Sequence, residues 1–302
     1  MRQLIALLVA IGALALLPMM GLGGYVLNIL VMIFIFVMLA VSLDLVMGWA
    51  GQFSFAHAAF FGIGAYTAAI LQRDFGTGFW SNLPAGMVVA GLCGLLLGLP
   101  ALRLRGHFLA IVTIAFQTIV YLALTQWKSL TGGQFGIEVQ PVEGFASIDR
   151  FYYLALGLSV ASVAIGWLLT HSRLGKAWQA VRDDEVLARA IGLNTTASKL
   201  AAFVLASALA GAAGVLVAHH IRGVTPDDFT VLSSATIVAM VVVGGRGTIW
   251  GPLLGAVVFT ALPEVLGFAA NYKLIIYGLL MIVMVIVMPE GVYGAWAGRK
   301  KK

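Results

Sequence analysis

The chain of 302 residues has little charge and a single cysteine. Charged residues make up 10% of it, against roughly 25% in soluble domains. With Cys93 alone, it can form neither an internal disulfide nor a thiolate metal cluster. The phosphate-binding pattern GxxxxGK[ST] is absent, because Gly175 and Lys176 are followed by Ala177. Without this pattern, ATP hydrolysis through a phosphate-binding loop is not supported. The motifs GxSxG and HExxH are absent too, so a hydrolase activity is not supported either.

Long apolar runs dominate instead. Hydrophobic residues make up 61% of the chain, and repeated runs approach the length of about 20 residues that crosses a bilayer. Glycine is abundant at 36 residues, and pairs four apart, such as Gly94 with Gly98 and Gly251 with Gly255, predict close helix packing. We predict an all-α polytopic membrane protein with helices broken at glycine-rich turns. Ten spans are expected, at about 4–20, 25–47, 54–72, 84–102, 107–126, 151–170, 200–219, 231–245, 251–268 and 273–289.

The distribution of lysine and arginine predicts the orientation. With the amino terminus inside, 13 of the 18 basic residues fall on one side of the membrane and 5 on the other. This agrees with the positive-inside rule and places both termini in the cytoplasm, with eight spans as the next possibility. Residues 1–302 are then one transmembrane domain. It includes an external loop at 127–150, a cytoplasmic segment at 171–199 and a basic cytoplasmic tail at 290–302.

Segment 171–199 is the longest charged run. Its first half carries three apolar residues at helical spacing, Leu174, Trp178 and Val181. A second short helix is expected from about 183 to 191, with acids in its first turn and Gly192 closing it in a left-handed conformation. The segment is either a solvated connector between two spans or a docking element for a cytoplasmic partner. If transport is uphill, a docking element is where another polypeptide would deliver the energy.

Few side chains within the predicted spans can carry chemistry. Asp44 is the clear carboxylate there and a functional candidate, although it lies close enough to the interface for a structural role. His57 is expected to pack with a hydrogen bond rather than bind a ligand. No metal-ligand spacing occurs, and no chain of buried acids and histidines supports a proton-driven carrier. The glycine-rich stretches 48–54 and 244–252 predict either irregular backbone lining a pathway or tight surface turns.

Five stretches resemble a known family and occur in its order. They are GWAGQFSFAHAAFFGIGAYTAAIL (48–71), LRLRGHFLAIVTIAFQTIV (102–120), SLTGGQFGI (129–137), RDDEVLARAIGLNTTASKLAAFVLASALAGAAGVL (182–216) and GGRGTIWGPLLGA (244–256). Together they resemble the permease subunits of bacterial branched-chain amino acid ABC importers, of the LivM type. The similarity extends from about residue 40 to residue 290.

The resemblance implies an inner-membrane permease subunit and not an enzyme. A homologous permease would pair with it, two cytoplasmic ATP-binding subunits would use the ATP, and an external solute-binding protein would deliver the solute. No cofactor in this chain and no nucleic acid are expected. Branched-chain, hydrophobic amino acids would cross by alternating access, although close relatives move urea or short-chain amides. A stand-alone channel or facilitator is the rival from another class, and a membrane enzyme is a distant third.

The resemblance also assigns residues. The segment around 182–193 would be the coupling helix that docks in a groove of an ATPase subunit. The matching docking residues are Arg182, Asp183, Asp184, Glu185, Ala190 and Gly192. A pathway role goes to Gln52, Ser54 and His57, and Asp44 joins them as the charged residue within a span. Asp44 departs from the family pattern, which leads us to expect a neutral polar residue such as asparagine there.

Overall fold

The computed structural model describes residues 12–21, 23–101, 107–265 and 278. These residues are mostly helical, and a single pair of two-residue strands is the only sheet among them. The elements of the first half are η1 (Leu17–Met20), α2 (Gly24–Asp44), η2 (Leu45–Trp49), α3 (His57–Phe75), α4 (Phe79–Ala101), α5 (His107–Gln126), α6 (Lys128–Thr131), η3 (Gly133–Phe135) and β1 (Ile137–Glu138). Those of the second half are α7 (Ile148–His171), α8 (Arg173–Asp183), α9 (Glu185–Ala190), α10 (Thr195–Ile221), β2 (Gly223–Val224), η4 (Pro226–Phe229), α11 (Val231–Gly244) and α12 (Trp250–Val265).

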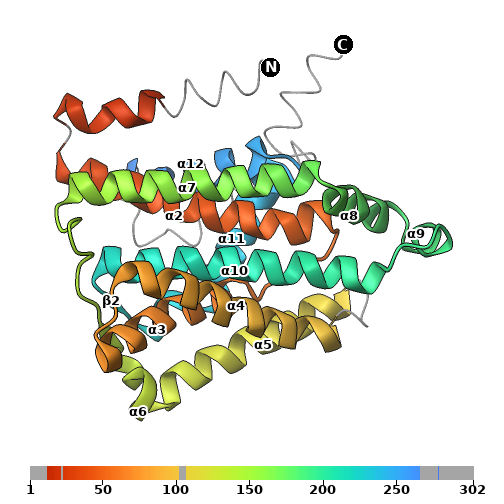
Figure 1. The fold of residues 1–302 in the computed structure, drawn as a ribbon, viewed down its shortest axis with the longest axis horizontal. Helices are drawn as coiled ribbons and strands as arrows, with labels where there is room; N and C mark the ends of the chain where they lie inside the picture. The colour runs from red at the N-terminus through yellow and green to blue at the C-terminus, as the bar shows by residue number, and fades with distance from the viewer. Residues whose placement is uncertain (1–11, 22, 102–106, 266–277, 279–302) are drawn as a thin grey trace.

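Helix α10 is the centre of the bundle. It packs against α3, α4 and α2, while α2 also packs against α7, α11 and α12 (Figure 1). Glycines make the closest crossings. Gly64 of α3 lies against the backbone of Gly211, and Gly214 lies against the carbonyl of Phe61, so a side chain would not fit at either position. Gly94 of α4 likewise lies against Ser207. The small residues therefore pack helices closely, as the sequence predicts.

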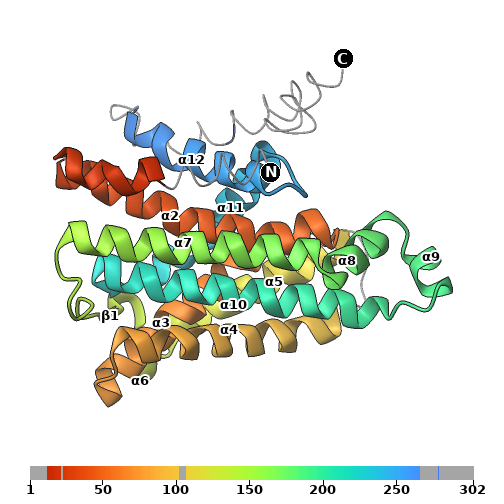
Figure 2. The same cartoon turned by 45° about the horizontal axis from the view of Figure 1, so that its top comes forward.

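The two ends of the bundle carry different structures. Helices α8 and α9 project from one end, and α6 with the strand pair lies at the other (Figures 1 and 2). The strands are antiparallel, with Ile137 opposite Val224 and Glu138 opposite Gly223. They join the loop that follows α6 to the turn that follows α10. The loops at 127–150 and 171–199 thus lie at opposite ends of α7, as the predicted topology requires, and the side that each faces stays a prediction.

Five helices are long and apolar enough to cross a membrane: Gly24–Trp49, Phe79–Pro100, Phe108–Gln126, Ile148–His171 and Thr195–Ile221. Two shorter apolar helices, Val231–Gly244 and Trp250–Leu262, accompany them. Helix α3 occupies the predicted span at 54–72 but, being less apolar, is not among the five. The span at 273–289, apart from residue 278, and the tail at 290–302 lie outside the described residues, as do the start of the span at 4–20 and the end of the span at 251–268. Ten spans and cytoplasmic termini remain predictions.

Each glycine-rich stretch lies where a helix ends. Helix α2 continues into the π-helix η2 and then into irregular backbone up to residue 56. Helix α11 ends at Gly244, and Gly245 and Gly247 take positive φ angles of 118° and 69° before α12 begins. Positive φ is accessible to glycine at little cost, whereas other residues are strained there. Irregular backbone is therefore present in both stretches, and a π-turn of this kind is frequent at functional sites; whether the stretches line a pathway or form surface turns stays a prediction.

A buried polar network crosses the bundle near the start of α11. The Gln117 side chain donates from Nε2 to the Phe229 carbonyl at 2.7 Å and accepts from Ser234 Oγ at 3.1 Å. Ser234 Oγ also accepts the backbone N–H of Ala58 at 2.9 Å. Gln117 and Ser234 have no exposed surface. The network joins α5, α3, α11 and η4, and every one of these hydrogen bonds replaces a contact with water that burial has removed.

We expect Gln117→Leu to destabilise the chain by about 1–3 kcal/mol, because the substitution leaves a buried carbonyl and hydroxyl with fewer partners. The measurement is the thermal unfolding midpoint of the purified chain in detergent. Thr118→Val is the matched control, since Thr118 is exposed and bonds only the Ile114 carbonyl of its own helix. Equal midpoints for Gln117→Leu and Thr118→Val would contradict the importance of the network.

Candidate functional site

Helix α8 is fixed to the bundle. Ser172 caps it, because its Oγ accepts the backbone N–H two residues further on at 3.1 Å. Gly175 lies against the carbonyl of Thr170, at the end of α7, where a side chain would not fit. Trp178 is fully buried, and its Nε1 donates to the Ser198 carbonyl in α10 at 2.8 Å. Helix α8 therefore bridges α7 and α10.

The apolar face predicted for α8 is correct at two of its three positions. Trp178 and Val181 are buried, at 0% and 4% exposure. Leu174 lies on the same face by its spacing but is 42% exposed. It differs because Gly175, rather than Leu174, makes the close contact with α7 in this first turn.

Helix α9 is capped where it begins and turned sharply where it ends. Asp184 is its N-cap, and Oδ1 accepts the backbone N–H groups two and three residues on at 2.8 and 3.0 Å. Gly192 takes a φ of 86° just after the helix, as predicted. The predicted helix at 183–191 is shorter in the structure, because Asp183 still belongs to α8 and Glu185 is the first residue of α9.

Glu185 ties α9 to α10 rather than facing outward. Its Oε1 lies 2.7 Å from Arg189 Nη2, and its Oε2 lies 2.9 Å from Lys199 Nζ. Thr195 Oγ1 also donates to Oε1, at 3.3 Å. The Glu185 side chain is only 17% exposed. Two cations and a hydroxyl therefore surround this carboxylate and hold the short helix in place.

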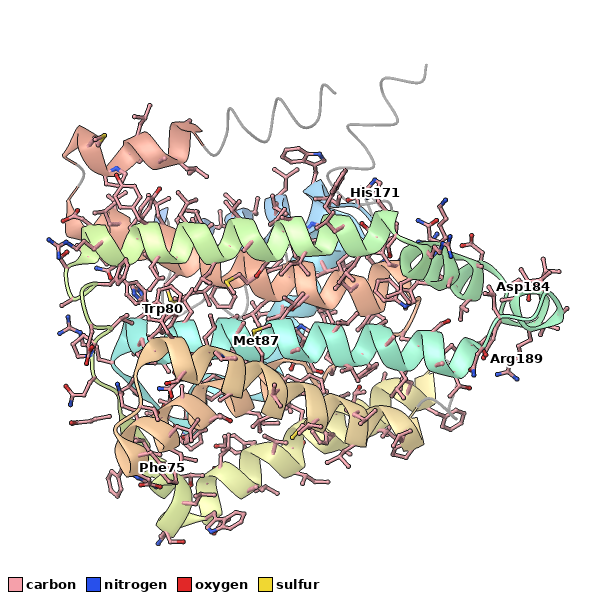
Figure 3. The ribbon with its side chains drawn as sticks, viewed as in Figure 1. Phe75, Trp80, Met87, His171, Asp184 and Arg189 are labelled. Atoms are coloured by element: carbon pink, nitrogen blue, oxygen red, sulfur yellow. The ribbon has the colours of Figure 1, made fainter. Side chains whose placement is uncertain are left out.

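The outward surface of α9 is apolar. Val186, Leu187 and Ile191 are 69%, 60% and 67% exposed, and Ala190 is exposed beside them. We call these four residues the α9 apolar surface. Figure 3 shows Asp184 and Arg189 on α9, at the tip that projects away from the bundle. Contiguous exposed apolar residues are typical of interaction sites, so this surface is a candidate for contact with another molecule.

The two glycine-rich breaks meet at the base of α8. Asp44, 3% exposed, accepts the backbone N–H of Gly247 at Oδ1, at 2.8 Å. Its Oδ2 accepts from Trp49 Nε1 at 3.1 Å. A side chain on Gly48 would collide with the Asp44 carboxylate and with the Gly247 nitrogen, which shows how closely the two backbones approach. Asp44 thus links the end of α2 to the turn between α11 and α12. We call Asp44, Gly48, Trp49 and Gly247 the glycine junction.

Arg182 reaches from α8 into the glycine junction. Its Nη1 donates to the Gly48 carbonyl at 2.8 Å, while Nε and Nη2 donate to Asp183 Oδ1 at 3.1 Å each. The aliphatic part of the side chain covers Gly51, where an added Cβ would lie 2.6 Å from Arg182 Cγ. The guanidinium of Arg182 bonds within this chain, and the predicted docking role of this residue stays a prediction.

The predicted pathway residues lie in the segment that follows the first break. Gln52, Ser54 and His57 are 4%, 1% and 2% exposed. His57 Nε2 lies 2.7 Å from Ser42 Oγ, so this histidine packs with a hydrogen bond, as expected. Ser54 Oγ accepts a backbone N–H two residues on at 3.2 Å. The Gln52 amide has no hydrogen-bond partner in the part of the chain that the structure describes. The pathway role of these residues and of Asp44 stays a prediction.

A cavity of about 480 Å³ lies between α2, α11, α12 and η4, and the sequence analysis did not find it. Two aspartates, Asp227 and Asp228, line it together with polar and apolar residues. The sequence feature that could have indicated this cavity is the acidic pair Asp227 and Asp228, which follows Pro226 shortly after a predicted span. Other lining residues include Asn28, Met32, Phe36, Phe61, Ser233, Thr236, Met240 and Phe259.

Comparison with known proteins gives one consistent result. The family model described as branched-chain amino acid transport system / permease component matches residues 25–285. The high-affinity branched-chain amino acid transport system permease protein LivM of Salmonella typhimurium is 36% identical, over 87% of this chain and 69% of that protein. LivM of Escherichia coli K12 is 35% identical, over 85% and 67%. The permease protein LivH of Escherichia coli K12 is 26% identical, over 86% and 91%.

Proposed function

Because the chain belongs to the family of branched-chain amino acid transport permease components, we propose that it is the membrane-spanning subunit of an ATP-driven importer for branched-chain, hydrophobic amino acids. Its apolar helices agree with a multi-pass membrane protein. We place it in the bacterial inner membrane, with ten spans and both termini in the cytoplasm. The subunit itself carries out transport and not catalysis.

The observation that carries the proposal is the form of α9. This helix is too short to be stable alone, yet it is capped by Asp184, held by Glu185 and projected from one end of the bundle with an apolar surface outward. An apolar helix face that projects into solvent fits a groove in a partner. The partner in the proposal is an ATP-binding subunit, and residues 182–193 are the coupling segment that receives its movement.

Within this segment we divide the predicted docking residues by what they contact. Val186, Leu187, Ala190 and Ile191 would enter the groove. Asp184 caps the start of the helix, Glu185 attaches it to α10, and Gly192 turns the chain at its end. Asp183, whose side chain is 68% exposed, lies at the rim of the docking surface, where a charge contributes little to affinity.

Four further proteins complete the importer in this proposal. They are a homologous permease, two cytoplasmic ATP-binding subunits and an external solute-binding protein. Similarity to both LivM and LivH proteins supports a pair of related permeases. No cofactor is proposed for this chain, because the partner subunits would use the ATP.

The pathway in this proposal passes the segment of Gln52, Ser54 and His57. Asp44 and His57 are already bonded to Gly247 and Ser42, respectively. The Gln52 amide has both its donor and its acceptor free among the described residues. It is therefore the side chain of the four with the most capacity to bond a passing amino acid.

The test is transport by the purified chain, reconstituted in liposomes with and without its candidate partners. We expect ATP-dependent accumulation of radiolabelled leucine only with the partners present, and none with a non-hydrolysable ATP analogue. Leucine flux through the isolated chain would instead support a channel. Transport of urea without leucine would support the amide alternative and overturn the amino acid assignment.

A further inference from the structure

We propose that Arg182 is a positioning residue that transmits movement of the α8–α9 pair to both helix breaks of the glycine junction. The proposal rests on the proposed function, in which an ATP-binding subunit moves that pair. It changes the role of Arg182 from contact with the partner to a connection inside the permease. Three structural links carry the proposal.

The first link is between Arg182 and the outer helices. Arg182 belongs to the last turn of α8, and α9 begins directly after the Asp184 cap. Because only the cap residue separates the two helices, displacement of α9 acts on the end of α8 at once. Gly175 holds the start of α8 on α7, and Trp178 holds its middle on α10. A force on α9 therefore acts on the last turn of α8, where Arg182 is.

The second link is between Arg182 and the two breaks. Nη1 donates to the Gly48 carbonyl of the π-turn, at 2.8 Å. A Cβ on Gly247 would lie 3.1 Å from both that Nη1 atom and the Gly48 oxygen. One guanidinium thus contacts the carbonyl of the first break and lies against the backbone of the second. Gly247 can approach so closely because it has no side chain.

The third link joins the breaks to each other. The Asp44 carboxylate accepts Trp49 Nε1 on one side and the Gly247 N–H on the other. A shift of the Gly48 backbone is therefore passed to the turn before α12.

The surroundings give Arg182 room to move. A cleft of about 430 Å³ opens beside it and is lined by Met47, Gly48, Gly51, Phe53, Val242 and Arg246. The Arg182 side chain is 38% exposed. A swing of the guanidinium into this cleft would release the Gly48 carbonyl without unpacking the core. Arg182 thus has a bonded position and free space next to it, as a connection with two states requires.

The first test compares Arg182→Met, Arg182→Lys and Arg173→Ala in the complete complex. Methionine keeps the stem over Gly51 and loses the bond to Gly48, lysine keeps the charge and one donor, and Arg173 is an exposed control on the same helix. For Arg182→Met we expect assembly with the ATP-binding subunits and ATP hydrolysis within twofold of wild type. Leucine uptake per ATP should fall about tenfold, in the range for residues that carry coupling between sites. Arg182→Lys should recover part of the loss, and Arg173→Ala should change nothing.

The second test uses the isolated chain and needs no transport. We expect hydrogen exchange of the backbone amides at 48–52 and 244–248 to be faster in Arg182→Met than in wild type, in both stretches together. Arg173→Ala should leave both unchanged.

Several outcomes would overturn the proposal. Loss of ATPase binding in Arg182→Met would make Arg182 a docking residue, and normal uptake per ATP would remove its coupling role. Unchanged exchange in either stretch would show that the guanidinium does not hold that break. If the wild-type complex moves no leucine, the proposed function fails, while the exchange result still decides whether Arg182 holds the glycine junction.

Discussion

Leu187→Asp combined with Ile191→Asp should abolish ATP-driven uptake while leaving the permease folded. Both side chains are more than half exposed on the α9 apolar surface, so the change costs the isolated chain little. In the complex each carboxylate would be buried in an apolar groove. A loss of about 2 kcal/mol at each position reduces affinity for the ATP-binding subunit about a thousandfold. The measurement is retention of that subunit by the tagged permease, followed by leucine uptake.

Two controls distinguish a loss of docking from misfolding of the permease and from a non-specific effect of added charge. Phe135→Asp places the same charge at another exposed apolar residue, 95% exposed, at the opposite end of the bundle, and should retain the ATP-binding subunits. Asp183→Lys reverses an exposed charge beside α9 and should weaken retention only slightly. The docking surface would be wrong if Asp183→Lys abolished retention while Leu187→Asp with Ile191→Asp preserved it.

Asp44→Ala should give the second large effect, a loss of stability of about 1–3 kcal/mol, because it leaves two half-buried donors without an acceptor. Those donors are the Gly247 N–H and Trp49 Nε1. The glycine junction would then lose its link between α2 and the turn before α12. The measurement is the thermal unfolding midpoint of the purified chain in detergent, together with the yield of assembled complex.

Asp44→Asn and Asp74→Ala make the comparison specific. Asparagine keeps one acceptor oxygen for the Gly247 N–H, so its midpoint should fall between those of wild type and Asp44→Ala. Asp74 pairs with Arg73 at an exposed helix end, and its removal should leave the midpoint unchanged. Equal midpoints for Asp44→Asn and Asp44→Ala would show that the negative charge, rather than the acceptor, stabilises the junction.

Much of the fold could be predicted from local sequence features. Apolar runs predicted the helices, and glycine clusters predicted irregular backbone at 48–54 and 244–252. Gly192 predicted the left-handed end of α9, because this feature depends on residues a few positions apart. Element boundaries were less certain. The predicted start of α9 at Asp183 was early by two residues, since a carboxylate before a helix can be a cap or a first-turn residue.

The candidate site could be predicted only in part, because its contacts are distant in sequence. The family resemblance assigned a docking role to Glu185, whose carboxylate pairs with Lys199 and Arg189, while the uncharged Leu187 faces outward. The bond from Arg182 to Gly48 joins residues 134 positions apart. Periodicity and spacing contain no information about such a pair. Asp44 could be identified as unusual, but its partner Gly247 could not.

The bond between Asp44 and Gly247 also affects the order in which the protein can be made. The two residues are 203 positions apart, so the carboxylate is synthesised long before its backbone donor. At about 5–20 residues per second, the interval is about 10–40 s. During that time Trp49, five residues further on, is the donor available nearby. The first break therefore cannot reach its final form until Gly247 has left the ribosome.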